Sequence, residues 1–300
     1  IFYLYYVKIR LILGAFTLMN YLLYNPKSSK GADKQKIESI KERLIGDVIC
    51  QNVLEDDKYL EILQKLTKDD DVILVGGDGT LNKFVNKLGG KAPEARVYLY
   101  ANGTGDDFFK DVSGGSKDEK ILINKYIENL PTVTVKGETY YFINGVGYGI
   151  DGYCCEEGDR LHAISDKPVN YTKIAIKGIL FKYKAANATV TVDGVTKTYK
   201  KCYIAPTMNG RYYGGGMLVA PKQDRLGDGS LTFVTMYGKG RLKTLMVFPS
   251  IFKGEHVNHT EMVDTITGRV ITVKFDRPTA LQIDGETISN VLEYTARSGK

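Results

Sequence analysis

The feature that most constrains the fold of this chain is a buried strand that runs directly into a glycine-rich loop. Residues 69–77 read DDDVILVGG, a short β-branched stretch bounded by charge on one side and glycine on the other. Such a stretch is typical of a parallel strand that is covered on both faces. Leu81, Phe84 and Val85 then follow at helical spacing. The segment therefore predicts a strand, a loop and a helix in direct succession.

The chain around this unit alternates strand-like and helix-like patterns. Between the strand-like runs, apolar residues recur every three or four positions, as on one face of a helix. Strands are predicted at residues 19–24, 46–50 and 95–101, and further helices are marked by Ile37, Ile40 and Leu44 and by Tyr59, Ile62, Leu63 and Leu66. This order predicts a parallel α/β sheet, with a ligand at the carboxyl ends of its strands.

After about Pro131 the pattern changes to strands rich in Thr, Tyr and Val and separated by glycine turns. One helical insert is predicted between them, around residues 169–183. The strand-like segments are 133–145, 188–208, 229–237, 269–276 and 279–287. We therefore expect an α/β domain over 19–131, rejoined by about 291–300, and an antiparallel β-sandwich over 132–290.

Composition and charge narrow the class of protein. The net charge of +6 suits contact with anionic lipid headgroups or nucleotide phosphates, but it is too dispersed for a nucleic-acid-binding domain. The four cysteines lack zinc-site spacing, which predicts free thiols in a reducing compartment. Residues 1–18 are apolar but carry Lys8 and Arg10 near their middle, so they fit neither a spanning helix nor a signal peptide. We interpret them as an extension before Met19, with a membrane-surface anchor as the alternative.

The glycine-rich loop has the composition of a phosphate-binding site. Glycines let backbone amides approach an oligophosphate without interference from a Cβ atom, and the helix that follows adds partial positive charge. The glycines are Gly76, Gly77 and Gly79. Asp78, on an exposed loop, would face magnesium or an acceptor hydroxyl, while Thr80 and Asn82 would donate hydrogen bonds to phosphate. The alternative is an ordinary turn with Thr80 as the helix N-cap.

Two commoner nucleotide motifs do not account for the sequence. The chain has no G-x-x-x-x-G-K-[ST] motif, which argues against a P-loop NTPase. Residues 147–152 match G-x-G-x-x-G, but YCCEEG follows them where a dinucleotide fold would place an apolar helix. We interpret that match as a coincidence.

Four motifs in order resemble the bacterial diacylglycerol kinase-like lipid kinases, which are relatives of sphingosine and ceramide kinases. They are NPKSS at 25–29, GGDGTLN at 76–82, GTGDDF at 103–108 and DGE at 284–286. The resemblance implies an α/β nucleotide domain and a β-sandwich with the active site between them. It also implies that the γ-phosphate of ATP passes to a lipid hydroxyl, such as that of diacylglycerol, with Mg²⁺ as the metal.

The resemblance assigns roles to individual residues. Glu286 would be the general base, supported by Asp284, and Asp78 would act with it at the reacting phosphate. A loop at 224–230 resembles the family's structural magnesium loop, in which Asp228 would be the metal ligand; a solvated turn is the alternative. The nucleotide would be contacted by Asn25, Lys27 and Ser28. Its phosphates would be held by Gly77, Asp78, Gly79 and Thr80 and contacted by Thr104 from the next loop.

The sequence departs from the family pattern at three places. Asp106 replaces an Asn before the Asp-Phe pair, and Lys83 stands where a Glu is usual. Residues 132–137 lack an acidic residue that members commonly carry. These departures change the charge of the predicted site and therefore how it would bind cations.

The acceptor is expected to be a lipid at a membrane surface. Residues 169–184 combine large apolar side chains with four lysines and could lie on an anionic bilayer, or form a core helix with solvated lysines. We expect a cytoplasmic protein at the inner face of the membrane, with homodimer formation left open. The alternatives are a kinase of a soluble acceptor, as in NAD kinases, and a non-catalytic lipid- or nucleotide-binding module.

Overall fold

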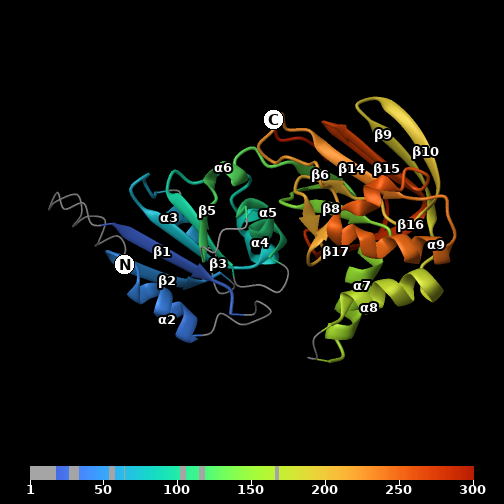
Figure 1. Ribbon diagram of the computed structural model, residues 1–300. Helices are drawn as coiled ribbons and strands as arrows, with labels where there is room; N and C mark the ends of the chain where they lie inside the picture. The colour runs from blue at the N-terminus through green and yellow to red at the C-terminus, as the bar shows by residue number, and fades with distance from the viewer. Residues whose placement is uncertain are drawn as a thin grey trace.

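The computed structural model describes residues 18–26, 34–53, 58–63, 65–101, 106–114, 119–165 and 169–300. The predicted extension up to residue 17 and the site candidates Lys27, Ser28 and Thr104 lie outside these ranges. Figure 1 shows the expected architecture, an N-terminal α/β domain followed by a C-terminal domain dominated by strands.

The N-terminal sheet has the strand order β2-β1-β3-β4-β5. The first four strands are parallel, as predicted, and β5 is added antiparallel to β4 at one edge. This edge strand was not predicted because it spans three residues, too few to show a pattern. The strands are β1 (Met19–Tyr24), β2 (Asp47–Asn52), β3 (Asp71–Gly76), β4 (Arg96–Ala101) and β5 (Lys120–Leu122).

Helices cover both faces of this sheet because alternate strand residues point to opposite sides. Val72 and Leu74 of β3 share a core with Phe84 of α4, whereas Ile73 shares a second core with Ile40 of α2. The helices are α2 (Lys34–Glu42), α3 (Lys58–Leu63), α4 (Asp78–Lys87), α5 (Asp107–Val112) and α6 (Asn124–Ile127).

The C-terminal domain contains a ten-stranded antiparallel sheet, which confirms the predicted fold class. Its main path runs β15-β14-β11-β8-β16-β17-β6-β7, and the β9–β10 hairpin joins through β16. The strands are β6 (Thr132–Val135), β7 (Glu138–Tyr141), β8 (Gly145–Tyr148), β9 (Ala186–Val192), β10 (Val195–Cys202), β11 (Thr207–Met208), β14 (Leu231–Met236), β15 (Val263–Gly268), β16 (Val270–Ile283) and β17 (Glu286–Arg297). A separate pair comprises β12 (Tyr212–Tyr213) and β13 (Met217–Leu218).

Two predictions about the end of the chain are wrong. The segments 269–276 and 279–287 were expected as separate strands, but β16 continues from the first into the second as far as Ile283, with its pairing to β17 interrupted between Lys274 and Thr279. Residues 291–297 were expected to return to the first domain. They belong instead to β17, which pairs with β16 and β6, because its apolar residues Val291, Tyr294 and Ala296 enter the core of the C-terminal sheet.

The second domain contains a helix that the sequence pattern did not predict. α7 (Ile150–His162) begins inside the G-x-G-x-x-G match, where we expected no helix. Gly152 lies in this helix and permits it to pack closely on β16. A Cβ at that position would lie 1.9 Å from the carbonyl oxygen of Ala280. The unit is still no dinucleotide motif, because β8 pairs antiparallel with its neighbours.

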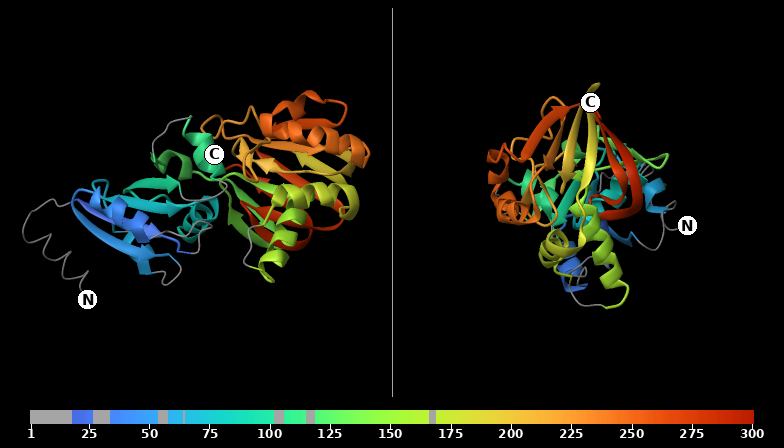
Figure 2. Two further views of the ribbon diagram at one scale, coloured as in Figure 1. Left: turned by 60° about the horizontal axis from the view of Figure 1, so that its bottom comes forward. Right: turned by 90° about the vertical axis from the view of Figure 1, so that its right-hand side faces the viewer.

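The remaining helices of this domain lie along the same sheet. Figure 2 shows the yellow-green helices beside the C-terminal strands. They include α8 (Tyr171–Lys177) and the π-helix η1 (Gly178–Lys182), followed later in the chain by α9 (Arg241–Val247), η2 (Phe248–Lys253) and η3 (Glu255–Asn258). In the ranges that the structure describes, no helix is both long and apolar enough to cross a membrane. The four cysteines are free thiols, as predicted.

Candidate active site

The glycine-rich loop forms the predicted junction between a strand and a helix. β3 ends at Gly76, and Gly77 precedes α4 in an extended conformation. A Cβ on Gly76 would lie 2.5 Å from the Thr80 side chain, so this glycine is required by the packing of the loop itself. A Cβ on Gly79 would meet no described atom within 4 Å. The open side at Gly79 leaves the start of α4 accessible to a ligand.

Thr80 lies inside the loop, and Asn25 lies beside it. The Thr80 side chain is buried, and the Asn25 side-chain amide donates to its Oγ1 at 3.4 Å. Gly77, rather than Thr80, is the N-cap of α4, and no side chain caps the helix. The structure therefore brings the end of β1 and the loop after β3 together, as expected for parallel neighbours.

Asn82 lies where the first domain meets the late acidic motif. Its side chain is buried, and its Nδ2 donates to Asp284 Oδ2 at 2.8 Å and to the Tyr141 carbonyl at 3.3 Å. Asn86 Nδ2 donates to Asn82 Oδ1 at 3.2 Å. The Asn82 amide group therefore links the two domains, and its expected phosphate contact stays a prediction.

Asp78 is also more enclosed than its expected exposed loop implied. It occupies the first turn of α4, where its carboxylate accepts the backbone N–H groups of Asp107 at 2.8 Å and Phe108 at 3.0 Å. Asp78 thus caps α5. The sequence alone could not predict this role, because it depends on the tertiary contact between α4 and α5. Burial raises the pKa of Asp78, and the two amides, with Asn144 and Arg225, oppose this shift.

Asp107 is a second buried carboxylate that the sequence reasoning missed. Its oxygens accept the backbone N–H groups of Gly215 at 2.8 Å and Gly216 at 2.6 Å. Burial, together with the nearby charge of Asp78, raises its pKa to about 7. The preceding Asp106 has φ 38°, in the left-handed region that Asn and Asp adopt more readily than most residues. Replacement of the usual Asn by Asp therefore preserves the turn.

A buried ionic network beside these carboxylates connects the domains and was likewise not predicted. Asp111 of α5 accepts from Arg211 Nε and Arg225 Nε, each at 2.6 Å. Arg225 is almost fully buried, lies over the Phe108 ring at 4.9 Å and donates to the Ile143 carbonyl. Nothing in the local sequence distinguishes this arginine from a solvated one.

The two acidic residues of the late motif occupy contrasting positions. Asp284 is half-buried, and its carboxylate accepts the backbone N–H groups of Ile143 at 2.6 Å, Asn144 at 2.8 Å and Gly145 at 3.0 Å. Burial raises the pKa of Asp284, and these amides oppose the shift. The Glu286 side chain is 54% exposed, and its Oε1 lies 3.1 Å from Lys83 Nζ on α4.

Asp228 is placed on an exposed turn of the C-terminal domain. Its Oδ1 accepts from the Ser230 backbone at 2.9 Å and from the Ser230 hydroxyl at 2.7 Å. These bonds lower the pKa of Asp228. The described residues contain no group of three or more His, Cys, Asp or Glu side chains that could hold a metal ion. The predicted metal role of Asp228 therefore gains no support from its neighbours.

Comparison with known proteins agrees with this geometry. Residues 20–135 match the diacylglycerol kinase catalytic domain, and residues 144–295 match the YegS C-terminal NAD kinase beta sandwich-like domain. The chain belongs to the diacylglycerol kinase-like family of lipid kinases.

Relatives of known name cover most of the chain. A diacylglycerol kinase of Mycobacterium tuberculosis (strain H37Rv) is 26% identical over 85% of this chain and 84% of its own length. A diacylglycerol kinase of Staphylococcus haemolyticus is 24% identical over 88% and 81%. The crystal structure of a diacylglycerol kinase from Bacillus anthracis matches 95% of this chain and 96% of its own, with a TM-score of 0.63 and 18% identity, and so supports the fold alone.

Membership of this family implies that the chain is a kinase. Phosphoryl transfer depends mainly on positioning and on neutralisation of charge. The structure places a glycine-rich helix start, two buried carboxylates and one accessible carboxylate around α4 and α5. These are the kinds of group that such a reaction requires.

Proposed function

We propose that the chain transfers the γ-phosphate of ATP to the hydroxyl group of a lipid such as diacylglycerol. The observation that carries the proposal is the docking of the late acidic turn on α4. Asn82 donates a hydrogen bond to Asp284. The next residue of α4, Lys83, forms an ion pair with Glu286, so the two domains meet on the helix that begins at the glycine loop. Glu286 thereby lies beside α4 and is accessible to an acceptor hydroxyl.

Each motif then has a physical role. Backbone amides at the very start of α4 bind phosphate oxygens, because the first N–H groups of a helix have no carbonyl partner within it. The Thr80 N–H is not one of them, since it donates to the Gly77 carbonyl at 3.0 Å. Glu286 accepts the proton of the acceptor hydroxyl as the bond to phosphorus forms. Asp78 and Asp107 are close enough for their charges to interact, and each oxygen that accepts an amide can accept a second bond. These two carboxylates fit an Mg²⁺ ion, which would neutralise charge on the nucleotide phosphates.

The segment predicted to contact a membrane divides between core and surface. Ile174 and Ile179 are buried in the second domain, which agrees with the core-helix alternative. Phe181 is 72% exposed, and it is joined by Leu242 at 73% and Met246 at 76%. Arg241 Nη1 donates to the Leu180 carbonyl at 2.6 Å, so η1 and α9 lie side by side (Figure 1).

This apolar surface of Phe181, Leu242 and Met246 supports a lipid acceptor. Lys182 and Lys243 are exposed next to it along the chain, and exposed aromatic and aliphatic groups with lysines are typical of proteins that lie on anionic bilayers. We infer that the chain associates peripherally with the membrane through this face. A soluble acceptor would give such exposed side chains no role.

The assay is transfer of labelled phosphate from ATP to diacylglycerol in anionic vesicles, compared with NAD and with no acceptor. We expect labelled phosphatidic acid from the vesicles. Labelled NADP would favour the soluble acceptor, and nucleotide binding without turnover would favour a non-catalytic module.

A double variant tests the surface separately. Phe181→Ser with Met246→Ser should reduce transfer on vesicles several-fold but not on a short-chain diacylglycerol dispersed in detergent. Val195→Ser is the matched control, because Val195 is 75% exposed at the start of β10. Equal activity of all three proteins on vesicles would contradict the membrane contact without affecting the assignment of the reaction.

A further inference from the structure

The loop at residues 224–230 directs backbone carbonyl oxygens at a lysine side chain. Lys300 Nζ donates to the carbonyl of Leu226 at 3.2 Å and to that of Gly227 at 2.9 Å. An ammonium group is a compact positive charge with three donors and no acceptor. It therefore fills the position that a small cation would take between two such oxygens.

A guanidinium extends the same arrangement by one residue. Arg269 Nη2 donates to the Asp228 carbonyl at 2.9 Å, and its Nη1 donates to the Lys300 carbonyl at 3.1 Å. Three consecutive carbonyl oxygens of the loop thus accept hydrogen bonds from cationic side chains. The two cations are also linked to each other through the backbone of Lys300.

The carboxylates of the loop are engaged in local bonds. Asp228 Oδ1 accepts from Ser230, and Asp224 Oδ1 accepts the Leu226 backbone N–H at 2.9 Å. Mg²⁺ needs near-octahedral oxygen coordination at short distances. With the Lys300 ammonium on the carbonyls, a divalent ion would lose those ligands and would be repelled by a like charge. The loop as it stands does not fit the magnesium ion that the family resemblance led us to expect.

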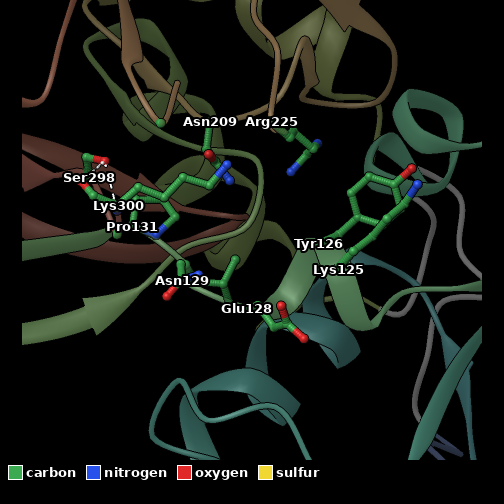
Figure 3. Close-up of a pocket in the computed structure, with 12 residues that line it drawn as sticks. Lys125, Tyr126, Glu128, Asn129, Pro131, Asn209, Arg225, Ser298 and Lys300 are labelled. Atoms are coloured by element: carbon green, nitrogen blue, oxygen red, sulfur yellow. Dashed lines mark hydrogen bonds between the residues drawn. The ribbon is translucent and has the colours of Figure 1, made fainter. Parts of the chain in front are cut away.

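The lysine stem is packed against the loop, so its position is fixed along its length. A Cβ on Gly229, whose φ is +87°, would lie 2.7 Å from Lys300 Cβ. The Lys300 N–H donates to Ser298 Oγ at 3.1 Å. Figure 3 shows Ser298 and Lys300 bordering the same pocket as Asn209 and Arg225.

We propose that the Lys300 ammonium, assisted by Arg269, acts as an internal cation that orders loop 224–230 without a divalent metal. The consequence extends to the domain boundary because Arg225 belongs to this loop. Its guanidinium is bonded to Asp111 of the first domain and to the Ile143 carbonyl. Order in the loop therefore helps to hold the two domains together, independently of the reaction that the chain catalyses.

The test is the thermal unfolding temperature of the nucleotide-free protein in EDTA and in excess Mg²⁺. Lys300→Met keeps the stem and removes the charge, and we expect it to lower the unfolding temperature by about 1.5–2 °C, the shift that loss of roughly 1 kcal/mol gives in a chain of 300 residues. Lys222→Met, an exposed lysine of the preceding segment, should leave it unchanged. Equal unfolding temperatures for the two variants would overturn the proposal.

Asp228→Asn distinguishes the lysine from a metal. The amide keeps the oxygen that accepts from Ser230 but loses the charge that a metal would require. We expect this variant and the wild type to respond identically to EDTA and Mg²⁺. A fall in wild-type unfolding temperature with EDTA that is absent in Asp228→Asn would show a metal in the loop and overturn the proposal. Should Lys300→Met fail to fold, Lys300→Arg keeps the comparison open, because the retained charge should preserve wild-type stability in EDTA.

Discussion

Two groups of carboxylates border the domain boundary, and they are held in opposite ways. Asp78, Asp107 and Asp284 are enclosed, and their oxygens accept backbone amides from the neighbouring chain segments. Glu286 is half exposed and is held by one lysine side chain. The enclosed carboxylates are fixed and help the domains to fit together. The accessible one retains the freedom that a proton acceptor needs, since it must meet a hydroxyl that enters from outside.

The strongest test of this comparison is the loss of an enclosed carboxylate. Asp78→Ala should abolish transfer, and it should also lower the free energy of unfolding by roughly 1–3 kcal/mol, because two α5 amides lose their acceptor inside the protein. Transfer and urea unfolding should both be measured. Asp69→Ala, an exposed carboxylate just before β3, is the control. Wild-type stability in Asp78→Ala would show that Asp78 serves the reaction without supporting the fold.

Glu286→Gln should separate chemistry from stability. The amide cannot accept the proton as a carboxylate does, so turnover should fall about a hundredfold or more. ATP affinity and unfolding should stay near wild type, because the side chain is exposed and its ion pair is worth little. Turnover and ATP affinity are measured across a magnesium series. Full rescue by magnesium would identify Glu286 as a metal ligand, and wild-type turnover would transfer the role of base to Asp78.

The sequence predicted the units that depend on local periodicity. β3, its glycine loop and α4 were located because a buried strand and an amphipathic helix each have a readable period. Asp107 could have been found from the GTGDDF motif, which contains it. Arg225 could not, because its role depends on Asp111 and Ile143, which lie more than eighty residues away. α7 was missed because its glycines weaken a helix in isolation, whereas in the fold Gly152 permits close packing on β16 and Gly158 permits close approach of Tyr171 of α8.

A further enclosed carboxyl group, that of Asp151, should make the stability of the protein depend on pH. Asp151 of α7 is buried, and burial raises its pKa from 3.8 to about 7. Between these values the folded protein retains a proton that the unfolded chain releases, so stability is fully present below about pH 4 and declines as the pH rises towards 7. One such group contributes a slope of about 1.4 kcal/mol per pH unit.

Asp151→Asn cannot ionise, so its free energy of unfolding should fall less steeply than that of the wild type between pH 5 and pH 7. Part of the slope should persist because the pKa of Asp107 is raised to about 7 as well. The measurement is urea unfolding of both proteins at several pH values. Parallel curves would mean that Asp151 is already ionised in the folded protein at pH 5.

The smallest expected effect is that of Lys83→Met, which is measured against its neighbour on α4, Asn82. Asn82 bonds the enclosed Asp284, whereas Lys83 pairs with the accessible Glu286. Asn82→Ala leaves a half-buried carboxylate short of a donor and should cost roughly 1–3 kcal/mol of unfolding free energy. Lys83→Met removes an exposed ion pair worth up to about 1 kcal/mol, so the free energy of unfolding of this variant should be nearly unchanged.

The turnover of Lys83→Met should change less than about tenfold, since a tenfold change needs about 1.4 kcal/mol. Unfolding and turnover of both variants give the comparison directly. A larger stability loss in Lys83→Met than in Asn82→Ala would show that the accessible pair, rather than the enclosed bond, holds the late turn on α4.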